Sequence, residues 1–260
     1  MIGFGEMRRL ALLWETDIAR VERVFALDWL LKGIFDREVL RQALALRGAA
    51  ALSKVYFADY PPIEDVDFVR GVGLDDLKLE SELGEAAEYA ARTSGMSYKL
   101  NSLQGTEARF EYIGPLGRRS AAQPHVPLRF LATPLRAVAV QGPMLHPFAD
   151  RFETTVRAVS LEETAAERIA QIGQRPRARE VYDLWFILRR GGRLLDRSAT
   201  RALAETIAAE KGRLVRAEFD PAYRPLLERA WENALKHVRG KPSFVQAEAE
   251  IKEGLAQILA

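Results

Sequence analysis

Two aspartates, Asp65 and Asp67, are the residues whose type and spacing point most directly to chemistry. Residues 65–70 alternate in a way that predicts a short β-strand ended by Gly71 and Gly73, so both carboxylates should point to one face. Two neighbouring carboxylates repel each other. Mg²⁺ relieves that repulsion, because it binds a few carboxylate oxygens together with water and substrate phosphates. The alternative is an exposed strand end with two solvated aspartates.

A glycine upstream of the pair adds a possible phosphate site. Gly48 follows an apolar run that predicts a strand, and it precedes alanine-rich residues 49–57 that predict a helix. The free N–H groups at the start of a helix bind phosphate. A phosphate cradle followed by two carboxylates on the next strand suits a Mg²⁺–nucleotide. The chemistry would be phosphoryl or nucleotidyl transfer, in which positioning and charge neutralisation do most of the catalysis.

A second group of charged residues lies in the C-terminal half of the chain. Its members share one segment of about 17 residues and are Glu167, Arg168, Arg175, Arg177, Arg179, Glu180 and Asp183. The planar fork of arginine suits phosphate, so a basic wall over a triphosphate is one interpretation, with Asp183 orienting an arginine. The other is an ordinary surface pair between Arg179 and Asp183, which are four residues apart on an expected helix.

The pattern of apolar residues predicts an α+β fold with two domains. The first 45 residues read as helices, with a break at Gly33 and a second helix capped by Asp36. A helix over residues 75–93 and strands within residues 96–140 follow. Ser160 and Glu163 form a capping-box pattern that begins a helical half. We therefore expect an α+β domain over residues 1–155 and an all-α domain over residues 156–260.

Composition excludes several classes of protein. The 260 residues include no cysteine and only three histidines, which excludes disulfide scaffolds and thiolate metal sites. The absence of a long uncharged apolar run predicts no membrane partner and a cytoplasmic location. The net charge of +2 divides into −2 for residues 1–150 and +4 for residues 151–260. This second value is compatible with nucleic-acid binding but too small to establish it.

Two separated stretches together resemble the AbiEii-type toxin nucleotidyltransferases of abortive-infection and type IV toxin–antitoxin systems. The first is DWLLKGIFDREVLRQALALRGAAALSKVYFADYPPIEDVDF, residues 28–68. The family there has Gly-Gly-Thr-Ala-Leu-x-Lys-x-Tyr, an Arg-x-Ser turn and Glu-Asp-hydrophobic-Asp-Phe. The second is SLEETAAERIAQIGQRPRAREVYDLWFIL, residues 160–188. The family there has Leu-Glu-Glu-hydrophobic-x-Ala-Glu-Lys and Arg-Asp-x-Tyr-Asp-Leu.

The resemblance implies a polymerase-β-like nucleotidyltransferase core, a mixed sheet with flanking helices, followed by a helical domain. It implies an enzyme that moves a nucleotide from an NTP to an acceptor, in some cases the 3′ end of tRNA, with Mg²⁺ as cofactor and a cognate antitoxin as partner. The residues implied to act are Asp65 and Asp67 on Mg²⁺, Gly48, Lys54 and Arg179 toward the nucleotide, and Arg168 and Asp183 in catalysis near the triphosphate.

Several positions depart from the family pattern. Ala49 and Ala50 replace a glycine and a hydroxyl residue, Ile63 lies in a Pro-Pro turn without the expected cation and hydroxyl, Arg168 replaces lysine and Glu180 replaces aspartate. In the strand expected to supply a third carboxylate, we predict Leu131 at that position. The alternative to an active transferase is therefore a catalytically degenerate protein of the same fold that binds nucleotide or a protein partner.

Overall fold

The computed structural model describes residues 2–117, 124–150 and 152–260, and the chain divides into two compact units, residues 1–159 and 160–260. We call them the sheet unit and the helical unit. The sequence placed the boundary after residue 155. The structure divides the chain four residues later, because Thr155–Ala158 form a strand (β7) of the sheet.

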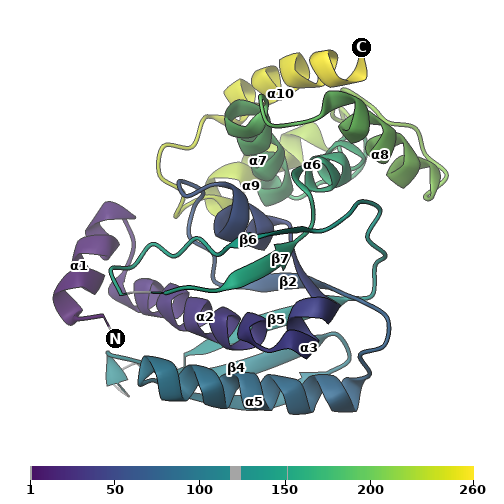
Figure 1. Ribbon diagram of the computed structural model, residues 1–260. Helices are drawn as coiled ribbons and strands as arrows, with labels where there is room; N and C mark the ends of the chain where they lie inside the picture. Colours follow the sequence, from purple (N-terminus) through teal and green to yellow (C-terminus); the bar gives the residue numbers. More distant parts are fainter. Residues whose placement is uncertain (1, 118–123, 151) are drawn as a thin grey trace. The chain divides into compact units, whose positions relative to one another are not determined.

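The sheet unit is built on one seven-stranded mixed sheet in the order β3-β4-β5-β2-β1-β7-β6 (Figure 1). Strand β2 is central, antiparallel to β1 and parallel to β5, and β1 is parallel to β7. The mixed sheet with helices confirms the expected α+β fold. Its other strands are β1 (Leu44–Arg47), β2 (Val66–Arg70), β3 (Ser97–Gln104), β4 (Glu107–Ile113), β5 (His125–Leu131) and β6 (Val140–Pro143).

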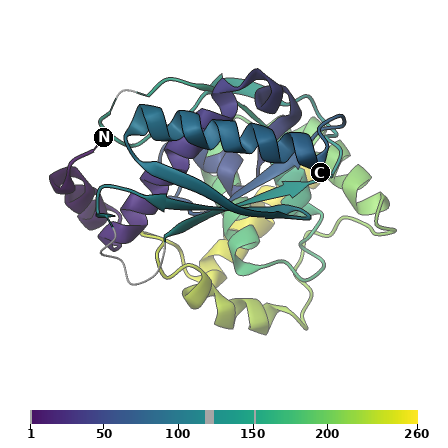
Figure 2. The same ribbon diagram turned by 90° about the horizontal axis from the view of Figure 1, so that it is seen from below.

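Two long helices, α2 (Ile18–Asp36) and α5 (Asp76–Ser94), lie side by side against one face of this sheet (Figures 1 and 2). Their starts are capped by Asp17 and Asp75, whose side chains accept backbone N–H bonds. The shorter helices of the unit are α1 (Phe4–Leu13), α3 (Glu38–Ala43), α4 (Ala49–Ala51) and the π-helical turn η1 (Leu52–Tyr56).

The predicted break at Gly33 is wrong, because Gly33 lies inside α2. A Cβ there would lie 2.3 Å from the Ala86 carbonyl oxygen, so this glycine lets α2 and α5 approach closely. The predicted Asp36 cap is wrong as well. The cap position of α3 is Arg37, which makes no side-chain cap bond.

Side-chain alternation gives the sheet a buried face and a second face with polar residues. Phe68 stacks on Phe130 and contacts Phe35 of α2, so the even-numbered residues of β2 face the helices. The odd-numbered Asp67 and Val69 therefore face the other way. Val69 is buried there with Ala45 and other apolar residues. The carboxylate pair lies on this second face.

The helical unit consists of short amphipathic helices around an aromatic and aliphatic core. Its first helix begins at Ser160, whose hydroxyl accepts the Glu163 N–H at 3.1 Å, which confirms the predicted start. Trp231 is buried and donates to the Pro242 carbonyl. The helices are α6 (Leu161–Ile169), α7 (Ala178–Phe186), the π-helical turn η3 (Ile187–Gly191), α8 (Arg197–Ala209), α9 (Arg224–Ala234) and α10 (Phe244–Leu259).

Membrane-spanning helices are not found in the part of the chain that the structure describes. Its helices are too short or too polar to cross a bilayer.

Candidate active site

The two aspartates lie at the start of β2, on the face of the sheet that α2 and α5 leave uncovered. Asp65 precedes the strand and Asp67 is its second residue. Their side chains are about half exposed, at 48% and 39%. Both lie near one guanidinium, that of Arg129 on β5, at 3.3 Å from Asp65 Oδ2 and 3.4 Å from Asp67 Oδ1. The two carboxylates therefore lie on the same face of the sheet, as predicted.

A row of alternating charges crosses four strands at the level of Asp67. Arg47 on β1 is the register partner of Asp67, Asp67 is the partner of Arg129, and Arg129 is the partner of Glu107 on β4. Register partners in a sheet share a face, so these four side chains emerge on the same side. This row cannot be predicted from the sequence, because a linear pattern does not reveal strand order and register.

The register also corrects the residue expected at the third carboxylate position. Leu131 lies beside Val69, which is buried in the apolar part of this face. The residue beside Asp67 on β5 is Arg129. A cation, not an aliphatic side chain, therefore occupies the place next to the aspartate pair.

The turn before β2 is tied to α2 by ion pairs. Glu64 accepts from Arg20 at 2.8 Å and from Arg23 at 2.5 Å, and all three side chains are at least partly buried. The cation that was expected within the Pro61-Pro62 turn is absent from it. These two arginines fix the turn instead, and so fix the start of the strand that carries the carboxylates.

Gly48 forms the turn that links β1 to the following helix, as predicted. Its backbone has φ +56° and ψ −132°, a conformation that residues with a Cβ rarely adopt. The helix continues as α4 and η1 to Tyr56. The amides of Ala49 and Ala50 open this helix, and their methyl side chains offer no further hydrogen-bond donor to a phosphate.

Lys54 is buried and ion-paired. Its ammonium lies 2.5 Å from Asp28 Oδ1 on α2, and the residue is 1% exposed. The other oxygen of Asp28 lies 2.9 Å from His146 Nδ1, and His146 Nε2 lies 2.8 Å from Asp150. The predicted contact of Lys54 with nucleotide does not fit this burial. The lysine joins η1 to α2 in a closed polar network.

Arg168 and Asp183 form a buried ion pair within the helical unit. Arg168 donates to Asp183 Oδ2 from Nη2 at 2.9 Å and from Nε at 3.2 Å. The side chains are 11% and 5% exposed. Burial lowers the pKa of Arg168, but the carboxylates of Asp183, Glu167 and Glu180 outweigh it and raise that pKa above its usual value. The guanidinium is therefore permanently charged and held in one orientation.

Arg179 and Glu180 both lie in the first turn of α7 and contact backbone atoms. Arg179 donates to the Ala234 carbonyl at 3.3 Å, so the expected pairing of Arg179 with Asp183 is wrong. Glu180 accepts the Arg177 N–H at 2.7 Å and so begins α7. Its carboxylate lies 4.0 Å from Arg168. A direct contact of Arg179 with nucleotide stays a prediction.

The donor set on the sheet fits one Mg²⁺ ion. Within the described residues, no group of three or more carboxylates and histidines could enclose a metal. Mg²⁺ needs only one or two carboxylates when water and substrate phosphates complete its octahedron. Asp65 and Asp67 supply that number of carboxylates, and one guanidinium, that of Arg129, lies within 3.4 Å of an oxygen of each.

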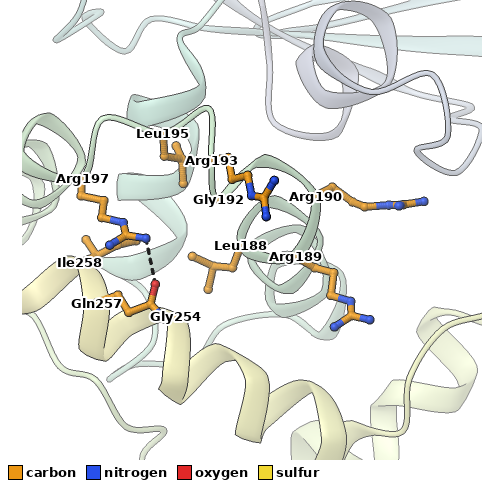
Figure 3. Close-up of a pocket in the computed structure, with 10 residues that line it drawn as sticks. All are labelled: Leu188, Arg189, Arg190, Gly192, Arg193, Leu195, Arg197, Gly254, Gln257 and Ile258. Carbon is orange, nitrogen blue, oxygen red and sulfur yellow. Dashed lines mark hydrogen bonds between the residues drawn. The ribbon is translucent and has the colours of Figure 1, made fainter.

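A second group of arginines surrounds a pocket of about 540 Å³ in the helical unit (Figure 3). The side chains of Leu188, Leu195 and Ile258 line it beside Arg193 and Arg197. Arg197 donates to the neutral amide of Gln257 at 2.9 Å, so its charge is not compensated by that partner. Arg189 and Arg190 of η3 also line the pocket, and their side chains extend to one side of it in the view of Figure 3.

A mixed sheet with two carboxylates and a glycine turn, followed by a helical unit, is the arrangement expected of a nucleotidyltransferase. The family model described as "Nucleotidyl transferase AbiEii toxin, Type IV TA system" matches residues 29–250. The chain belongs to this family and is a nucleotidyltransferase toxin of a type IV toxin–antitoxin system. Its family generally uses an NTP and a divalent metal, and a cognate antitoxin is implied.

The structure is similar to that of MenT4, a nucleotidyltransferase toxin from Mycobacterium tuberculosis H37Rv. The TM-score is 0.72 at 18% sequence identity, over 100% of this chain and 90% of that one. At this identity the likeness concerns the fold. No curated protein matches the sequence significantly.

Proposed function

We propose that this protein transfers a nucleotide from a Mg²⁺-bound NTP to an RNA acceptor, with the 3′ end of tRNA as the first acceptor to test. One observation carries the proposal. Asp65 and Asp67 lie on the face of the sheet opposite α2 and α5, and one cationic side chain, that of Arg129, contacts both carboxylates. A nucleotidyltransferase needs such a point to neutralise the triphosphate.

The sheet unit would bind the nucleotide. Asp65 and Asp67 would hold Mg²⁺, which reduces the negative charge that an incoming hydroxyl must approach. The Gly48 turn places the first amides of α4 directly after the end of β1. The last residue of β1, Arg47, is the register partner of Asp67. Backbone N–H groups in such a turn bind phosphate oxygens.

The helical unit would contribute Arg168. In the reaction, the acceptor hydroxyl oxygen forms a bond to the α-phosphorus, the bond to pyrophosphate breaks and the hydroxyl proton is released. Developing charge on phosphate oxygens is stabilised most by a cation that is already oriented, which is the reason for proposing Arg168. Asp183 supplies that orientation through two hydrogen bonds from Arg168 to one carboxylate oxygen.

An RNA acceptor is supported by the charge of the helical half. Residues 151–260 carry a net charge of +4, and four arginines line the pocket beside η3. Arginine suits the phosphodiester backbone, because its fork binds two phosphate oxygens at once.

The proposal is tested by mixing the protein with Mg²⁺, total tRNA and each labelled NTP in turn. Asp65→Asn and Asp67→Asn should each lower incorporation by at least about 100-fold. Asp76→Asn is the matched control, because the substitution removes the same charge away from the site. Asp76 pairs with Arg70, which lies at the other end of β2. Incorporation that persists in both site variants, or its absence from the folded wild-type protein with every NTP, contradicts the proposal.

A further inference from the structure

The guanidinium of Arg129 occupies the space between the two carboxylates of the candidate metal site. Its Nη2 lies 3.3 Å from Asp65 Oδ2 and its Nε lies 3.4 Å from Asp67 Oδ1. Two different nitrogens of one planar group therefore contact two different aspartates. The side chain of Arg129 is 38% exposed, so it is held by these contacts and not by burial.

The surroundings of Arg129 are arranged to keep it there. Glu107 on β4 is its register partner on one side and Asp67 on β2 is its partner on the other, so its β-strand position is flanked by negative charge. The next position of β5 on the same face is Leu131, beside the buried Val69. If the side chain of Arg129 pointed along the strand toward Leu131, its charged guanidinium would be transferred from water to apolar surroundings, which is unfavourable.

We infer that Arg129 is a positioning residue that acts as a built-in cation at this site: it holds Asp65 and Asp67 together when the site lacks metal, and a divalent cation must displace it. This inference rests on the proposed function, because it concerns the same two carboxylates. It adds that the affinity of the site for metal is set by competition with a side chain of the protein itself.

The competition has a physical consequence that can be measured without any turnover. With Arg129 in place, the charge of the two carboxylates is already partly neutralised. The positive guanidinium also repels an incoming divalent cation. Once the guanidinium is removed, the two carboxylates are left with their mutual repulsion, which a divalent cation relieves. Removal of Arg129 therefore strengthens metal binding, whereas loss of an ordinary structural arginine does not.

The test is a titration of the purified full-length protein with Mn²⁺, followed by the electron paramagnetic resonance signal of free Mn²⁺. Arg129→Gln should bind Mn²⁺ about tenfold more tightly than the wild type, which corresponds to about 1.4 kcal/mol. The Mn²⁺ affinity of Arg129→Lys should lie between those of the wild type and Arg129→Gln, because lysine keeps the charge but has no fork to bridge both carboxylates. Circular dichroism verifies that each variant is folded.

Two controls make the result specific. Arg109→Gln removes the same charge from the neighbouring strand β4 on the same face, two residues from Glu107, and should leave the affinity unchanged. A double variant of Asp65→Asn and Asp67→Asn should lose the binding.

The outcomes separate the inference from the proposed function. If Arg129→Gln binds Mn²⁺ as the wild type does, or more weakly, while the double aspartate variant loses binding, the inference is overturned and the metal site stands. If neither the wild type nor Arg129→Gln binds Mn²⁺, both the inference and the metal site are contradicted. An equal gain in affinity for Arg109→Gln would show a general charge effect and would overturn the inference as well.

Discussion

The side chains that we propose for catalysis are already ion-paired within the protein. Arg129 contacts both aspartates of the sheet, and Asp183 holds Arg168. The sequence predicted the aspartate pair from its spacing together with the upstream Gly48 turn and the family motif. It could not predict Arg129, because the register of β2 against β5 joins residues more than 60 positions apart.

The role of Arg168 is tested by two substitutions that differ in charge. Arg168→Gln should lower kcat/KM for nucleotide transfer by at least about 100-fold, because an oriented charge at the phosphate is lost. Arg168→Lys should retain more activity, since it keeps the charge but cannot donate twice to Asp183. Steady-state kinetics with a saturating RNA acceptor make the comparison. Equal rates for wild type and Arg168→Gln would exclude this catalytic role.

A pH dependence of stability is expected from Glu22 on α2. Burial raises the pKa of this carboxyl above 4.5, although the Leu116 N–H that it accepts at 2.6 Å opposes the shift. The folded protein therefore holds this proton more strongly than the unfolded chain does. The stabilisation of the folded state by protonated Glu22 is full below the pKa that this carboxyl has in the unfolded chain. It is lost as the pH rises through the higher pKa that the carboxyl has in the folded protein.

Comparison with Glu22→Gln isolates that contribution. The free energy of unfolding of the wild type, minus that of Glu22→Gln, should fall as the pH rises from about 4 to about 7. Urea unfolding curves at several pH values measure it. A difference that is constant or grows with pH would contradict the raised pKa.

At the scale of the element, the helix after Gly48 is held by a polar network and not by its own length. The α4 and η1 segments are only three and five residues long, which is too short for independent stability. Lys54, Asp28 and His146 join η1 to α2 in the interior. The sequence predicted this helix correctly but assigned Lys54 to the nucleotide, because a lysine in a motif gives no sign of its burial.

Removal of the Lys54 ammonium should destabilise the protein. Lys54→Met leaves Asp28 without its closest partner in a fully buried position, and a loss of about 3 kcal/mol in the free energy of unfolding is expected. Lys78→Met is the control, because Lys78 is exposed on α5 and its side chain makes no ion pair among those described. Chemical denaturation measures both. A loss of less than about 1 kcal/mol for Lys54→Met would show that the network contributes little.

At the scale of the whole molecule, we propose that the sheet unit binds the nucleotide and that the arginine-lined pocket of the helical unit binds the acceptor. The sheet unit carries the carboxylates and the glycine turn, and the helical unit carries Arg168 and the arginine-lined pocket (Figures 1 and 3). The α+β and helical halves were predictable from hydrophobic periodicity and the cap at Ser160. Strand β7 was not predicted, since four residues are too few for their alternation to distinguish a strand from a loop.

The pocket beside η3 is expected to bind RNA through charge. The double variant Arg193→Glu and Arg197→Glu should weaken tRNA binding by at least about tenfold in a fluorescence anisotropy titration, with a smaller salt dependence. The matched control, Arg229→Glu with Lys236→Glu, makes the same change of charge on and just after α9. Equal weakening in both double variants would mean that net charge, and not this pocket, governs the affinity.

The most direct measurement of the central claim is the intact mass of a purified tRNA after incubation with the protein, Mg²⁺ and the four NTPs. We predict that the RNA gains the mass of whole nucleotide residues, and that the gain is absent with the double variant of Asp65→Asn and Asp67→Asn. An RNA of unchanged mass, with the nucleotide either hydrolysed or attached to the protein, would contradict transfer to RNA. A gain of mass that the double variant also produces would contradict the assignment of the two aspartates.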